Sequence, residues 1–70
     1  MTTELQIKLN GENKNVEDGA TLQTLIERLD FAPERLAIEH NFDVVRRADW
    51  PDIELSEGDR VEIVHFVGGG

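Results

Sequence analysis

The sequence predicts an α+β fold, with a mixed sheet of four to five strands and one main helix packed on one face. Three observations predict it: an alternating apolar pattern near the start, one segment with helical apolar spacing, and a β-like apolar run near the end. The chain has 70 residues, which is enough for one such domain with a small core.

The first two strands are predicted to form a hairpin. Apolar and polar residues alternate over residues 5–9, which is the pattern of a strand with one buried face. Asn10 and Gly11 follow directly, and this pair favours a type I′ turn because both positions need positive φ. The returning strand, about residues 12–16, is polar and is predicted to lie at an edge of the sheet.

One helix is predicted over residues 22–29. Its apolar residues recur at the i, i+3, i+4 and i+7 spacing of a single helical face. Thr21 is the expected N-cap, because its hydroxyl can accept a hydrogen bond from a free amide of the first turn. Pro33 prevents a simple continuation of the helix. We therefore expect the helix to lay one apolar stripe across the sheet.

Three further strands are predicted in the second half of the chain, over residues 36–39, 44–45 and 60–67. A turn over residues 41–43 separates the first two. The segment before the last strand is predicted to be irregular, with Trp50 as a plug of the core. This element order resembles the β-grasp, or ubiquitin-like, fold, in which the last strand lies beside the first and the helix supplies the crossover.

The charge and the residue inventory exclude several classes of partner and site. Fifteen acidic against seven basic side chains give a net charge of −8, which repels phosphate backbones and anionic lipid surfaces. We therefore expect no nucleic-acid or membrane partner, and favour a basic protein surface. The sequence has no cysteine, and His40 and His65 are too few for a zinc site. The N-terminus lacks the pattern of a signal peptide, so a cytoplasmic protein is expected.

Catalytic residues are hard to assemble from this sequence. No nucleophile can be paired with a base, so we expect that the chain is not an enzyme. Glu54, Glu57, Asp59 and Glu62 are expected to form a solvated edge rather than a buried acid/base pair. His65 is expected to be a structural or surface histidine.

Two places on the chain are candidates for partner docking. Period-2 alternation in the last strand places Val64 and Phe66 on the face opposite the helix. These two residues either form an open docking surface or lie under the Trp50 segment. Arg46 and Arg47 form a basic spot on an acidic protein, either solvated or used for docking.

The final residues Gly68, Gly69 and Gly70 suggest a tail for a narrow channel, because glycine carries no side chain. The reactive group of such a tail is the α-carboxylate of Gly70, which adenylation by ATP can activate. A flexible stub without function is the alternative. We expect a domain over residues 1–67 and a flexible tail over residues 68–70.

Several short motifs, in order along the whole chain, resemble the ThiS family of sulfur carriers of thiamine thiazole biosynthesis. They are Asp18-Gly19-Ala20-Thr21-Leu22, Ala37-Ile38 with Asn41, Val45 with Arg47 and Trp50, Gly58-Asp59, and the closing VEIVHFVGGG. One position departs from the pattern, since Arg46 stands where relatives often carry proline.

The resemblance implies that a ThiF-like adenylyltransferase activates Gly70 with ATP and magnesium. A persulfide enzyme would then supply sulfur, and the thiocarboxylate would pass to the thiazole synthase ThiG. In that role the chain is a carrier that binds no cofactor and is a monomer when free. Three alternatives stay open: a MoaD-like carrier for molybdopterin synthesis, a ubiquitin-like protein modifier, and a β-grasp interaction module whose glycines are incidental.

Overall fold

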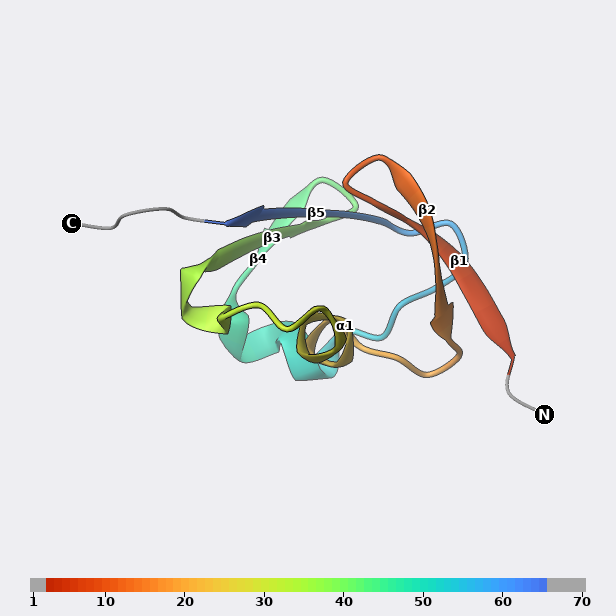
Figure 1. Cartoon of the computed structure of the whole chain (residues 1–70), viewed down its shortest axis with the longest axis horizontal. Coiled ribbons are helices and arrows are strands. Elements are labelled where there is room, and N and C mark those ends of the chain that lie inside the picture. The colour runs from red at the N-terminus through yellow and green to blue at the C-terminus, as the bar shows by residue number, and fades with distance from the viewer. Residues whose placement is uncertain (1–2, 66–70) are drawn as a thin grey trace.

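The structure is a computed structural model that describes residues 3–65 (Figure 1). The first half of the chain contains strands β1 (Glu4–Leu9) and β2 (Glu12–Glu17) and the helix α1 (Leu22–Leu29). The second half contains, in order, η1 (Pro33–Arg35), β3 (Leu36–His40), β4 (Asp43–Val45), η2 (Arg47–Asp52) and β5 (Arg60–His65), where η1 and η2 are 3₁₀ helices. The strands form one sheet in the order β2-β1-β5-β3-β4. The predicted α+β fold is confirmed.

The first hairpin forms as its sequence predicts. β1 and β2 are antiparallel, and the turn between them has positive φ at Asn10 (49°) and Gly11 (84°). Both values suit a two-residue turn whose twist matches the flanking strands. β2 lies at one edge of the sheet and ends one residue later than predicted, at Glu17.

The helix α1 begins and ends where the sequence indicates. The Thr21 hydroxyl accepts a hydrogen bond from the amide of Thr24 at 3.2 Å, so the predicted N-cap is confirmed. At the other end Asp30 adopts a left-handed conformation with φ 59°, and its amide donates to the carbonyl of Glu27.

Strand β5 lies at the centre of the sheet. It runs parallel to β1 and antiparallel to β3, so α1 lies in the crossover that leads from the first hairpin to the rest of the sheet. β5 is described as far as His65, and residues 66 and 67 of the predicted strand lie outside the described residues.

The second half of the chain differs from the prediction at two places. The turn between β3 and β4 consists of Asn41 and Phe42, both at positive φ (51° and 74°), and Asp43 already belongs to β4. The segment around Trp50 is not irregular as predicted but forms the 3₁₀ helix η2. A single short helix of this kind carries no apolar periodicity that a sequence reading can detect.

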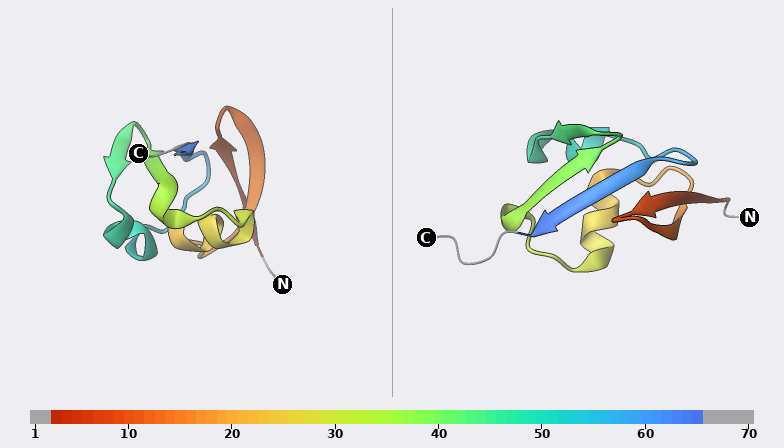
Figure 2. Two further views of the ribbon diagram at one scale, coloured as in Figure 1. Left: turned by 60° about the vertical axis from the view of Figure 1, so that its left-hand side comes forward. Right: turned by 90° about the horizontal axis from the view of Figure 1, so that it is seen from above.

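The core lies between the sheet and the layer formed by α1 and η2, and Figure 2 (left) shows both on the same side of the sheet. Its buried residues are Ile7, Ala20, Leu22, Leu25, Ile26, Leu36, Ile38, Trp50, Leu55 and Val61. Trp50 is 1% exposed and its Nε1 donates to the carbonyl of Val45 at 3.3 Å, so the predicted core plug is confirmed. The opposite face of the sheet carries no described helix.

Candidate functional site

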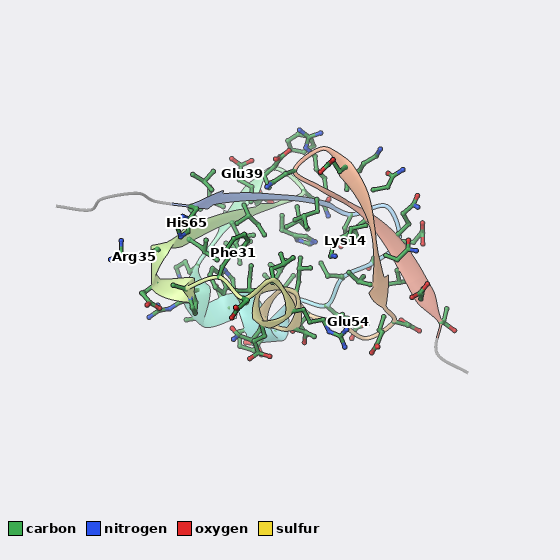
Figure 3. The ribbon with its side chains drawn as sticks, in the orientation of Figure 1. Lys14, Phe31, Arg35, Glu39, Glu54 and His65 are labelled. Atoms are coloured by element: carbon green, nitrogen blue, oxygen red, sulfur yellow. The ribbon has the colours of Figure 1, made fainter. Side chains whose placement is uncertain are left out.

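The outer face of the sheet, opposite α1, exposes apolar side chains beside two carboxylates. Val64 of β5 is 57% exposed and lies opposite Ala37 of β3, and Val44 of β4 is 75% exposed. Glu39 lies opposite both Val44 and Glu62, so these side chains share one face. Glu39 points away from α1 in Figure 3. We call this group, Ala37, Glu39, Val44, Glu62 and Val64, the outer-face patch.

The structure decides between the two readings of Val64. The Trp50 segment does not cover it, because η2 packs against α1 on the other side of the sheet and Trp50 itself is in the core. Val64 is therefore open, as a docking surface requires. Phe66, its predicted neighbour on this face, lies outside the described residues.

His65 lies on the same side of β5 as Val61 and Ile63, the side that faces α1. Its ring stacks on Phe31 with centroids 5.8 Å apart and an interplanar angle of 29°. Phe31 follows α1 and is 42% exposed, and His65 is also exposed. The expectation of a surface histidine is confirmed. Figure 3 shows Phe31, Arg35 and His65 together at the end of the sheet where β5 ends.

Arg46 and Arg47 belong to a different surface. They line a hollow of about 660 Å³ together with Gln23, Pro33, Ala48 and Pro51, which come from α1, η1 and η2. Both arginines are exposed, and Arg46 Nε lies 3.7 Å from Asp49 Oδ2. This hollow is in the helical layer, so the structure does not bring the arginines together with Val64 on one docking face.

A second hollow, of about 570 Å³, lies between β2 and α1. Its lining includes Lys14 and Val16 from the strand and Leu25, Arg28 and Leu29 from the helix. Arg28 forms an exposed ion pair with Glu17 at 3.4 Å, which bridges the two elements. Pairs of this kind contribute little to stability, and we assign no chemistry to this hollow.

Asp59 corrects the expectation of a solvated acidic edge. Its side chain is 12% exposed and accepts hydrogen bonds from His40 Nε2 (2.8 Å), the Ser56 amide (2.9 Å) and Asn41 Nδ2 (3.2 Å). Burial raises the pKa of Asp59, but the hydrogen bonds from His40, Ser56 and Asn41 outweigh this effect and hold the pKa below its usual value. The group ties the β3–β4 turn to the start of β5.

The same turn makes two further contacts with β5. The Asn41 amide donates to the Arg60 carbonyl at 2.8 Å, and the Arg60 amide donates to Asn41 Oδ1 at 2.9 Å. The Arg60 guanidinium lies 4.8 Å from the ring centroid of Phe42, within reach of a cation–π interaction. We interpret this arrangement as structural, because these hydrogen bonds and the cation–π contact all join residues of the fold to one another.

Within residues 3–65, no group of three or more His, Asp or Glu side chains is arranged to hold a metal ion. None of the helices in this part of the chain has the length and apolar character needed to cross a membrane. The glycines at 68–70 and the predicted reactive carboxylate of Gly70 lie outside the described residues.

Sequence reasoning missed two features: the place of Val44 in the outer-face patch and the contact of Phe31 with His65. Val44 enters the outer-face patch only through the pairing of β3 with β4, which the sequence does not give. Phe31 meets His65 only because the chain after α1 returns under the end of β5. The available signal was an apolar residue, Phe31 or Val44, in a short polar segment. Such a residue can indicate an exposed contact, but the sequence does not show which residue it contacts.

The fold and its central strand define a ubiquitin-like β-grasp domain, in which the last strand is placed between the first and the third. The sequence profile of the ThiS family matches residues 7–70, and the chain belongs to that family.

Three similar proteins illustrate the relationship. The sulfur carrier protein ThiS of Bacillus subtilis is 34% identical over 65 residues, which cover 91% of this chain and 98% of that protein. A thiazole synthase of Magnetococcus marinus is 48% identical over 66 residues, which cover 94% of this chain but 20% of that protein. The chain therefore spans about a fifth of the thiazole synthases that it matches. The crystal structure of a thiamine biosynthesis protein (ThiS) from Geobacter metallireducens superposes with a TM-score of 0.81 and 28% identity, over 94% of this chain and 100% of that one.

Proposed function

We propose that this chain is a sulfur carrier of thiamine biosynthesis and that the α-carboxylate of Gly70 carries the sulfur as a thiocarboxylate. The observation that carries the proposal is the match to the ThiS family, which runs to residue 70 and so includes all three glycines. The relative from Bacillus subtilis that bears the name sulfur carrier protein ThiS supports it across nearly its whole length.

The proposed chemistry begins with activation, because a carboxylate has no good leaving group. A ThiF-like adenylyltransferase would join a Gly70 oxygen to the α-phosphorus of ATP, with magnesium bound to the phosphates and pyrophosphate as the leaving group. The outer sulfur of a persulfide on the donor enzyme then attacks the acyl carbon, and AMP leaves. A second thiol of the donor attacks the inner sulfur of the persulfide and breaks its S–S bond, so Gly70 keeps the outer sulfur as the thiocarboxylate and the two donor thiols end as a disulfide.

The sulfur would next pass to a thiazole synthase of the ThiG type. The likeness to two proteins named thiazole synthase supports this partner, since each contains a segment that resembles this chain. Because the steps use ATP and thiols, we propose that they take place in the cytoplasm. In this scheme the chain supplies the acyl group and its partners make and break the bonds.

The folded domain, which we take as residues 1–67, would present the tail, residues 68–70, to these partners. The outer-face patch supports this role, because it exposes Val44 and Val64 next to Glu39 and Glu62. A partner surface with apolar and basic side chains would complement it. Arg46 and Arg47 would serve as a separate docking point, because they lie in the helical layer.

The proposal is tested by intact mass after incubation with the ThiF-like enzyme, ATP, magnesium and a persulfide donor. We expect the chain to gain the mass difference between sulfur and oxygen, and a variant that lacks Gly70 to stay unmodified. The matched control is omission of ATP, which should also prevent the gain. An unchanged mass would reject the carrier role, and adducts of protein size would point to a protein modifier instead.

A further inference from the structure

The central strand β5 is paired very differently on its two sides. Toward β3 the pairing continues without a break from His40 opposite Val61 to Leu36 opposite His65. Toward β1 it contains only Lys8 opposite Arg60 and Leu9 opposite Val61. Figure 2 (right) shows β5 extending past the end of β1 toward the C-terminus.

The hydrogen bonds show which main-chain groups face the shorter side. Because the Asn41 amide donates to the Arg60 carbonyl, the alternate residues Glu62 and Val64 also bond toward β3. The main-chain groups of Val61, Ile63 and His65 therefore point toward β1. The Asn10 amide, which donates to the Val61 carbonyl at 2.9 Å, agrees with this direction.

Asn10 ends the pairing with its side chain. A parallel strand would next offer its carbonyl to the Ile63 amide, but the chain turns away at Asn10, where φ is 49°. The Asn10 side-chain oxygen Oδ1 accepts this hydrogen bond instead, at 2.7 Å. On the side of β5 that faces β1, three main-chain groups have no hydrogen-bond partner within residues 3–65. They are the carbonyl of Ile63 and the amide and carbonyl of His65.

We propose that this edge of β5 accepts an extended segment of the activating enzyme, the ThiF-like adenylyltransferase, which would bind as an added strand over Ile63–His65. The proposal rests on the proposed function and names where that partner binds. Unpaired main-chain donors and acceptors in a row select an extended backbone rather than a helix or a small molecule. The edge ends at His65, three positions before Gly68 in sequence, so a strand bound there would fix the direction in which the tail leaves the domain.

The neighbouring side chains define the chemistry of the incoming segment. Its residue opposite Val64 would lie on the outer face and would be apolar, because Val64 is largely exposed. Its neighbours on the other face would meet His65 and the exposed ring of Phe31. The net charge of −8 favours lysine or arginine at the ends of the segment.

Amide hydrogen exchange tests the added strand directly. In the free chain we expect the His65 amide to exchange fast, whereas the Val64 amide exchanges slowly because it bonds to β3. Saturation with the ThiF-like enzyme should slow exchange at His65 by about tenfold or more, and leave Val64 unchanged. Equally fast exchange at His65 in the complex would overturn the proposal. Protection at His65 that grows with the concentration of the free chain would also overturn it, because the occupant would be a second copy.

A pair of substitutions provides the matched control. H65P removes the outward amide, and proline is tolerated where a strand amide has no partner. H65A removes the same imidazole and keeps the amide. We expect H65P to bind the activating enzyme about tenfold more weakly than H65A. Equal affinities would contradict the proposal, and the exchange experiment on the unaltered chain decides the matter should H65P fail to fold.

The two proposals can fail separately. If the unaltered chain never gains sulfur, the proposed function fails whatever the exchange at His65 shows. If it gains sulfur while His65 stays unprotected in the complex, only the strand proposal fails.

Discussion

Replacing Asp59 with alanine removes the acceptor that ties the start of β5 to the β3–β4 turn. The carboxylate accepts three hydrogen bonds of 2.8–3.2 Å, from His40, Ser56 and Asn41. Each net hydrogen bond contributes about 1 kcal/mol to stability, and more when one partner is charged. Asp59→Ala should therefore lower the free energy of unfolding by about 3–4 kcal/mol.

Urea and thermal unfolding, followed by circular dichroism, measure this loss. A domain of this size has a total stability of about 3–10 kcal/mol, so the change is large. The melting temperature should fall by roughly 4–8 °C for each kcal/mol. Glu54→Ala is the matched control, because Glu54 is exposed, and it should change stability by less than about 0.5 kcal/mol. A loss below about 1 kcal/mol for Asp59→Ala would refute the reasoning.

The pH dependence of stability tests the same contacts independently. The folded-state pKa of Asp59 lies below its usual value, so the unfolded chain binds this proton more tightly than the folded one. The stabilisation is then present above the usual carboxyl pKa and is lost as the pH falls through the folded-state value. Asp59→Asn has no such proton, so acid should destabilise it less than the unaltered chain. Equal acid sensitivity of the two proteins would show that Asp59 is not the group responsible.

Three further substitutions test other parts of the account. Trp50→Ala should lower the free energy of unfolding by about 3–5 kcal/mol, because the indole fills the core; a change near that of a surface site would mean that η2 does not anchor the helical layer. Asn10→Gly keeps the positive φ of the turn, so it should cost about 1 kcal/mol and speed amide exchange at Ile63, whose amide loses its acceptor; unchanged exchange there would contradict the role of the Asn10 side chain. Val64→Asp should cost about 1 kcal/mol of stability, because aspartate is disfavoured in strands and lies near Glu62, and should weaken binding to the activating enzyme; unchanged affinity would remove Val64 from the docking surface.

The local order of the fold could be predicted from the sequence, because it depends on neighbours in the chain. The turn at Asn10 and Gly11 follows from the need for positive φ, and the start of α1 follows from the capping hydroxyl of Thr21. The helical apolar spacing then placed Leu22, Leu25 and Ile26 in the core. These signals lie within a few residues of the structure that they specify.

The features that depend on contacts between distant residues could not be predicted. Asp59 and His40 are 19 residues apart, and only the pairing of β3 with β5 brings them together. The incomplete pairing of β5 with β1 depends on where Asn10 turns the chain relative to Ile63, 53 residues later. At the candidate site, the alternation along the last strand predicts that Val64 lies on the face opposite the helix. Whether the Trp50 segment covers Val64 depends on the position of η2, which the sequence does not show.

The most direct measurement follows the sulfur from this chain into the product. The thiocarboxylate would be prepared with a heavy sulfur isotope and mixed with thiazole synthase and its other substrates for a single turnover. We expect the isotope to leave Gly70 and to appear in the thiazole ring, with the chain returned to its carboxylate form. A thiazole product without the isotope, while the label stays on the chain, would contradict the role of Gly70 as the sulfur carrier.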